Sequence, residues 1–266
     1  MIGAIIGDIA GSRFEWMNHK GKDFELFTNS CMPTDDSFMT LALAKAILEC
    51  ERDYSQLEGK AIYHMQMFGR KYPNTGYGKL FRRWINSDIP MPYNSYGNGA
   101  AMRVSPCGFA SSSLEEAVML AKTVTEVTHN HPEALKAAEA VASAIYLGKT
   151  GKSLENIKAH ITEHYYRIDF TLDEIRPEYH FDVTCQGSVP HAFEAFYESQ
   201  SFEDAIRNAI SIGGDSDTIA AITGGMAEAY YGVPDHLRQQ TLAFLDHEQR
   251  TVLESFEKQF EHPWQE

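Results

Sequence analysis

The sequence has few cysteines, no long hydrophobic run and no excess of basic residues. Its thiols are scattered, with no CxxC pair or short spacing, at Cys31, Cys50, Cys107 and Cys185. A disulfide framework or a cysteine zinc site is therefore not expected. No apolar run approaches the roughly 20 residues that cross a bilayer. The apolar start MIGAIIGDIAGSRFE lacks a basic leader and is interrupted by Asp8, unlike a signal peptide. We expect no membrane association and a cytoplasmic location.

The charge balance is acidic. Lys and Arg number 23 against 37 Asp and Glu, so the net charge is −14, which opposes general binding to nucleic acid or to anionic membranes. Hydrophobic residues make up 43% of the 266 residues, enough for one large core. No Pro/Gly/Ser-rich linker, repeat or low-complexity tract divides the chain. We expect a single domain over residues 1–266 and a monomer.

Strand-like alternation is also scarce, whereas apolar positions recur at three- and four-residue spacing. This spacing is typical of helices and is found in residues 40–49, 114–129, 132–148, 202–213, 218–232 and 251–260. Ser113 with Glu116 has the pattern of a capping box, Pro132 suits a first helical position, and Ser201 precedes another helical segment. The sequence predicts an all-α fold, a single compact multi-helix domain.

Adjacent acids stand before two of these helical segments. PTDDS (33–37) holds Asp35 and Asp36, and GGDSDT (213–218) holds Asp215, Asp217 and Thr218. One interpretation is helix capping, because acids at a helix start accept bonds from free amides and suit the helix dipole. The other is a binuclear cation site, because adjacent helical residues point about 100° apart and can face different ions. Such oxygen ligands suit Mg²⁺ or Mn²⁺. The two acidic starts together favour a metal cleft at helix N-termini.

The order of five motifs resembles the ADP-ribosylglycohydrolase family, whose members include the glycohydrolase that reactivates dinitrogenase reductase. The motifs are GAIIGDIAGSRFE, PTDDS, YGNGAAMRVSP, THNHPEA and GGDSDTIAAITGGMAEAYYG, and they span nearly the whole chain. The resemblance implies an all-helical fold and two Mg²⁺ or Mn²⁺ ions in a cleft. Carried over by motif, the metal ligands are Thr34, Asp35, Asp36, Asp215, Asp217 and Thr218.

Further site residues follow from the same resemblance. Glu15 matches the family's early glutamate and is implied in catalysis, although a solvated acid at a helix end is the alternative. The opening has GDIAG where the family commonly has GDALG. His129 is implied to lie near the substrate, and Arg103 either contacts a phosphate or forms a structural ion pair. The loop that holds the distal ribose and diphosphate matches Gly97, Asn98, Gly99 and Ala100.

The implied reaction is hydrolysis of the glycosidic bond between ADP-ribose and an acceptor, with release of ADP-ribose. Catalysis would depend on Glu15 as acid or base and on Asp35 and Asp36 through the ions that they hold. Two alternatives stay open: a two-metal phosphohydrolase, because carboxylate-bound Mg²⁺ equally suits phosphoryl transfer, and a catalytically silent scaffold. The acceptor, whether arginine, serine, a nucleobase or a small molecule, is not encoded in any motif.

Overall fold

A computed structural model describes residues 1–260. Its α-helices, in chain order, are α1 Ile2–Ser12, α2 Asp35–Leu48, α3 Leu57–Lys71, α4 Lys79–Ile85, α5 Ser105–Ala110, α6 Leu114–Glu126, α7 Pro132–Lys149, α8 Leu154–His164, α9 Leu172–Ile175, α10 Cys185–Tyr197, α11 Phe202–Ser211, α12 Ser216–Tyr231, α13 Asp235–Leu242 and α14 His247–Gln259. Two short 3₁₀ helices, η1 Tyr54–Gln56 and η2 Asn98–Ala100, complete the set.

The all-α prediction is confirmed, because no β-strand occurs within residues 1–260 and every segment with helical spacing contains a helix. The predicted helix-start residues lie at the N-termini of α6, α7 and α11. The Ser113 hydroxyl accepts from Glu116 N, but the Glu116 carboxylate accepts from Ser112 N, one residue beyond a standard capping box. Ser201 caps α11, and Pro132 opens α7. None of the described helices is long and apolar enough to span a membrane.

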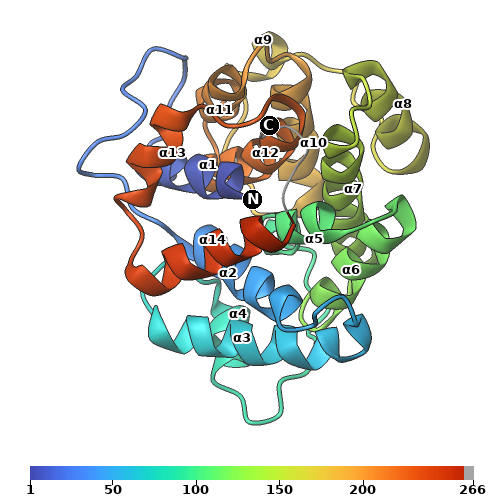
Figure 1. The fold of residues 1–266 in the computed structure, drawn as a ribbon. Helices are drawn as coiled ribbons and strands as arrows, with labels where there is room; N and C mark the ends of the chain where they lie inside the picture. The colour runs from blue at the N-terminus through green and yellow to red at the C-terminus, as the bar shows by residue number, and fades with distance from the viewer. Residues whose placement is uncertain (261–266) are drawn as a thin grey trace.

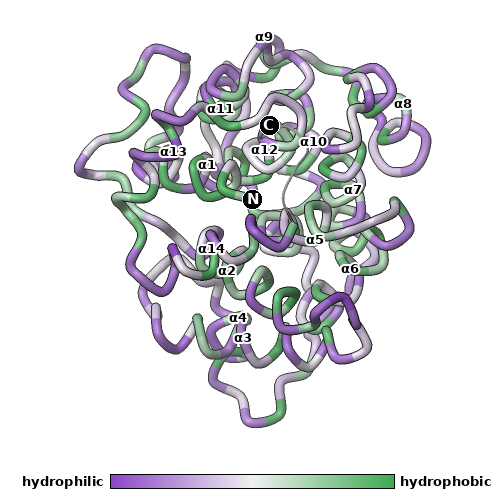
Figure 2. Tube along the Cα trace, in the orientation of Figure 1, coloured by the Kyte–Doolittle hydropathy of each residue, from purple (hydrophilic) through white to green (hydrophobic). Residues whose placement is uncertain are grey.

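The helices pack around α12, which contacts α1, α7, α10 and α11. In Figure 1, α1 lies beside α12 near the middle of the view, and the red helix α14 crosses α2. Helix α2 packs in turn on α3, while α6 packs on α7 at the other side. Figure 2 shows the hydrophobic residues gathered mainly in the inner helices and the hydrophilic ones in outer loops and helices such as α8. The core therefore surrounds α12, which packs against α1 and α2 on one side and against α7 on another.

A row of glycines brings α1 and α12 into backbone contact. Gly3, Gly7 and Gly11 recur every fourth residue and so share one face of α1. A Cβ at Gly7 would lie 1.9 Å from the Ala220 oxygen, and one at Gly11 would lie 2.6 Å from the Asp217 Cα. Only glycine permits this approach, which sets Asp8 on α1 close to the first turn of α12.

Candidate active site

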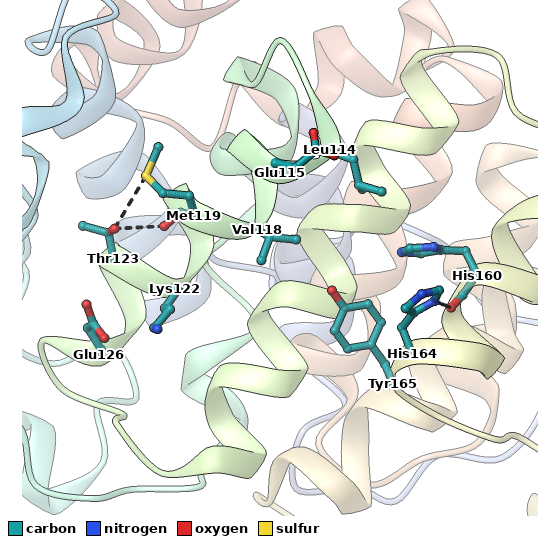
Figure 3. Close-up of a pocket in the computed structure, with 10 residues that line it drawn as sticks. All are labelled: Leu114, Glu115, Val118, Met119, Lys122, Thr123, Glu126, His160, His164 and Tyr165. Carbon is teal, nitrogen blue, oxygen red and sulfur yellow. Dashed lines mark hydrogen bonds between the residues drawn. The ribbon is translucent and has the colours of Figure 1, made fainter.

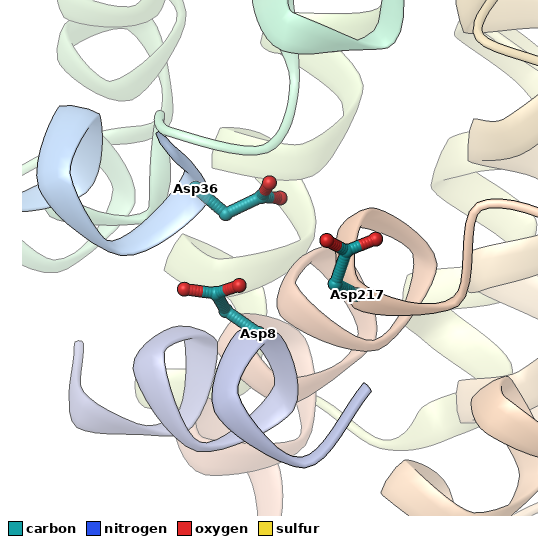
Figure 4. Close-up of side chains that lie close together, drawn as sticks. All are labelled: Asp8, Asp36 and Asp217. Atoms are coloured by element: carbon teal, nitrogen blue, oxygen red, sulfur yellow. The ribbon is translucent and has the colours of Figure 1, made fainter. Parts of the chain in front are cut away.

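Three helices deliver buried carboxylates to one place. Asp8 comes from α1, Asp36 from the first turn of α2, and Asp217 from the first turn of α12. Figure 4 shows the three carboxylates pointing toward one another, and each offers an oxygen within 4.8 Å of the others. A second group, Glu15, Asp215 and Asp217, meets the same distance limit. Asp217 belongs to both groups, so the acids form two adjoining triads.

Simple capping does not account for the acidic helix starts. At α2 the N-cap is Thr34, whose side chain accepts from Asp36 N. At α12 the N-cap is Asp215, but its side chain makes no capping bond to the described residues. Gly213 and Gly214 both have positive φ, +73° and +72°, a conformation that glycine adopts without steric cost. The carboxylate of Asp215 is therefore free to face the site.

The acids differ in their hydrogen bonds. Asp8 accepts from the backbone N and the hydroxyl of both Thr34 and Ser37, so the start of α2 occupies its oxygens. Asp36 Oδ2 accepts from the Thr218 hydroxyl at 3.2 Å and lies 3.3 Å from Thr34 Oγ1, whose single proton is closer to Asp8. Asp36 Oδ1 is buried and has no hydrogen-bond partner within residues 1–260. Burying a carboxylate oxygen without a partner is costly. A cation bound to this oxygen would remove that cost.

Burial and crowding make these carboxylates hard to ionise without a cation. Burial raises the pKa of Asp36 and Asp217 well above its usual range, and neighbouring carboxylates raise it further. The same two causes raise the pKa of Glu15 to about 7. Divalent cations would offset this repulsion, so the charge and the oxygen chemistry of the residues fit hard metal ions.

Four acids of the two triads, Glu15, Asp36, Asp215 and Asp217, line a pocket of about 390 Å³, whereas Asp8 lies behind its wall and is fully buried. Asp35 also lines it, but its carboxylate belongs to neither triad. Asp35 Oδ1 lies against Gly76, where an added Cβ would be 2.3 Å away. A more open hollow of about 680 Å³ lies at α6 and α8 (Figure 3), and residues 1–260 place no triad of possible metal ligands there. The acidic pocket is therefore the candidate active site.

The glycine loop forms another wall of this pocket. Gly97, Asn98 and Gly99 line it, whereas Ala100 is fully buried and does not. The Asn98 side chain donates to Asp215 Oδ2 at 2.6 Å, so this loop and the acidic cluster are directly joined. Among the four backbone N–H groups of residues 97–100, only that of Gly99 has no hydrogen-bond partner within the described chain.

A model of the ADP-ribosylglycohydrolase family matches residues 1–265. The chain belongs to the ADP-ribosylglycohydrolase family. The ADP-ribosylhydrolase ARH3 of Mus musculus is 25% identical, over 92% of this chain and 86% of that protein. The ADP-ribosyl-[dinitrogen reductase] glycohydrolase of Rhodospirillum rubrum is 26% identical, over 76% and 70%. A solved structure titled ADP-ribosylglycohydrolase-related protein complex shares the fold, with a TM-score of 0.72, 24% identity and 97% and 95% coverage.

Sequence reasoning missed two aromatic residues that line the pocket and one acid of the triads. Trp16 and Phe181 stack at the rim, with ring centroids 4.8 Å apart and exposed fractions of 77% and 41%. Asp8 lies in the GDIAG motif, but the sequence alone suggested no function for it. The stretch EYHFDV, residues 178–183 with two aromatics between acids, was the available signal for Phe181. No local pattern pairs it with Trp16, which lies 165 positions earlier.

Proposed function

We propose that the protein hydrolyses the glycosidic bond between ADP-ribose and an acceptor and that two divalent cations, Mg²⁺ or Mn²⁺, support the reaction. The observation that carries this proposal is the pair of carboxylate triads sharing Asp217, in a pocket whose other wall holds Asn98 and His129. This combination fits a ligand with ribose hydroxyls at one end and a bond to be cleaved beside acids.

The cations would be held by the acidic helix starts. When bound, they supply Lewis-acid polarisation and neutralise the charge of the cluster. Asp36 Oδ1 supports this assignment most directly, because it is buried and unpaired in the described chain. The proposed ligand set is the one implied by the family motifs: Thr34, Asp35, Asp36, Asp215, Asp217 and Thr218.

Glu15 is proposed as the group that moves protons. Cleavage of a ribosyl bond develops oxocarbenium character, and it needs a positioned water and a proton for the leaving group. Glu15 lines the pocket and has a pKa raised to about 7 by burial and by the neighbouring Asp215 and Asp8. A carboxyl group with that pKa exchanges protons readily near neutral pH.

The proposed substrate is an ADP-ribosylated protein side chain or a related conjugate. The name of the Rhodospirillum rubrum relative refers to ADP-ribosylated dinitrogen reductase, and this supports a protein acceptor here. Arginine, serine and nucleobase acceptors are compared in the test below. The monomeric state and cytoplasmic location expected from the sequence stay predictions.

The test is incubation of the purified protein with Mg²⁺ or Mn²⁺ against ADP-ribosylated arginine, serine and nucleic-acid substrates, with analysis of the products. We expect release of intact ADP-ribose from one class. Asp217→Asn should abolish it, while Asp235→Asn, an exposed acid at the start of α13, should not. Release of AMP or phosphate from ADP-ribose would instead identify a phosphohydrolase. Binding of ADP-ribose with no turnover on any arm would identify a silent scaffold.

A further inference from the structure

Three buried polar side chains form a chain of contacts beside the pocket, apart from the carboxylates. Arg103, Thr128 and His129 are 1%, 0% and 6% exposed. The Arg103 guanidinium forms no ion pair with a carboxylate in residues 1–260. The structural ion pair considered for Arg103 is therefore wrong for the described chain. Its Nη2 instead donates to Thr128 Oγ1 at 2.6 Å and lies 3.4 Å from His129 Nδ1.

The position of the protons follows from what each group can donate. Arginine has only N–H donors and no acceptor, so an Nδ1–H on His129 would place its proton against the Arg103 N–H groups 3.4 Å away, whereas an Nδ1 lone pair can accept from Arg103 as well as from the Thr128 hydroxyl. Thr128 Oγ1 lies 2.8 Å from His129 Nδ1 and 3.3 Å from the Thr125 oxygen. The shorter contact favours donation from the hydroxyl to Nδ1. His129 Nδ1 then carries a lone pair, and the proton of the neutral ring sits on Nε2.

The Nε2 side of the ring faces the glycine loop. A Cβ placed on Gly99 would lie 3.5 Å from His129 Nε2, and one placed on Gly97 would lie 3.7 Å from it. All three residues line the pocket. No residue of the described chain forms a hydrogen bond with His129 Nε2. The ring therefore offers one fixed, unused N–H group to a ligand in the pocket.

We propose that Arg103 and Thr128 are positioning residues that hold His129 as the neutral Nε2–H tautomer, so that it donates a hydrogen bond to an oxygen of ADP-ribose and takes up no proton during the reaction. The identity of the ligand rests on the proposed function, but the tautomer does not. The absence of glycine side chains at positions 97 and 99 gives the ligand oxygen access to this donor.

The electrostatic surroundings agree with a neutral ring. Burial lowers the pKa of His129 well below its usual range, and the Arg103 charge lowers it further. The Tyr93 ring also lies against the His129 ring, with ring centroids 5.5 Å apart. Burial raises the pKa of Tyr93 to about 12, so it carries no negative charge at neutral pH. Neither Arg103 nor Tyr93 therefore supplies an anion that would stabilise an imidazolium at His129.

The first experiment is ¹⁵N NMR of the ligand-free protein at pH 7 with labelled histidine, His129 being assigned by comparison with His129→Gln. We expect a protonated Nε2 and a bare Nδ1. In Thr128→Val, which keeps the shape but removes the hydroxyl, this preference should weaken toward a mixture. A protonated Nδ1 in the wild type would overturn the proposal, whether or not the protein binds ADP-ribose.

The second experiment measures ADP-ribose binding by calorimetry. It also measures turnover on whichever ADP-ribosylated substrate the protein hydrolyses in the test of the proposed function. A glutamine amide can donate from the position of Nε2, so His129→Gln should keep the Kd within about threefold, while His129→Leu should weaken binding about tenfold. His236→Gln, an exposed histidine on α13, is the control. If Gln and Leu both leave Kd unchanged and lower kcat 10²-fold or more, His129 acts as a base and the proposal fails. Failure of the wild type to bind ADP-ribose would refute the proposed function and leave the tautomer to the NMR result.

Discussion

Asp8 and Asp36 are both buried acids, yet they have different capacities for a cation. A carboxylate offers about four lone-pair positions. Asp8 receives four donors from Thr34 and Ser37, whereas one oxygen of Asp36 receives none within residues 1–260. Asp8 thus holds the start of α2 in place, and Asp36 is the stronger candidate ligand, even though both belong to the same triad.

Glu15 provides the clearest prediction for a single residue. Glu15→Gln keeps the size of the side chain and removes its titrating charge, so turnover should fall by about 10² to 10⁴ if it handles protons. Metal and ADP-ribose binding should persist. Single-turnover release of ADP-ribose, with calorimetry of both ligands, measures these quantities. Lost metal binding would make Glu15 a ligand, and near-normal turnover would remove it from the mechanism.

Among the elements, the contact between α1 and α12 positions the site. Gly7→Ala would force a Cβ to within 1.9 Å of a backbone oxygen of α12, and overpacking that shifts the backbone typically costs about 1–3 kcal/mol, occasionally more. We expect a large loss in the free energy of unfolding, measured by chemical denaturation.

The matched control is Gly59→Ala on α3, where a Cβ meets nothing within 4 Å. This change should raise the free energy of unfolding by up to about 1 kcal/mol, because alanine has the higher helix propensity. Equal stability of the Gly7 and Gly59 variants would show that the close approach of α1 to α12 is unimportant.

The helices were predictable because their apolar spacing is a local property of the sequence. Spacing also identified the acids at positions 35, 36, 215 and 217, since each pair stands directly before a helical segment. It did not reveal that Thr34 would cap α2 while Asp215 would cap nothing. That outcome depends on the two left-handed glycines, Gly213 and Gly214, which turn the chain before α12.

On the scale of the whole molecule, the contacts that complete the pocket join distant segments. Asn98 reaches Asp215 across 117 positions, and Trp16 meets Phe181. Neither pairing leaves a periodic signal in one sequence, because each depends on how the helices pack. The family resemblance supplied the candidate residues, and packing decided which of them meet.

The stability of the metal-free protein should depend on pH. Burial raises the pKa of Glu15 from 4.5 to about 7 and that of Asp35 from 3.8 to about 8. The folded state therefore binds more protons than the unfolded state over this range, and the free energy of unfolding falls as pH rises. In EDTA, the melting temperature should decrease between pH 6.5 and 8. Saturating Mg²⁺ should reduce this slope, since cations replace the protons. A flat profile in EDTA would contradict the crowding of these acids.

The measurement that tests the central claim most directly is the initial rate of ADP-ribose release from the ADP-ribosylated substrate that the protein hydrolyses. This rate is measured as a function of free Mg²⁺ or Mn²⁺. If the carboxylate triads hold the ions that support hydrolysis, the rate is negligible in EDTA and rises to saturation with added cation. Asp217→Asn should stay near the EDTA rate at every cation concentration, because this residue belongs to both triads. A wild-type rate that is the same in EDTA and in saturating cation would contradict the account.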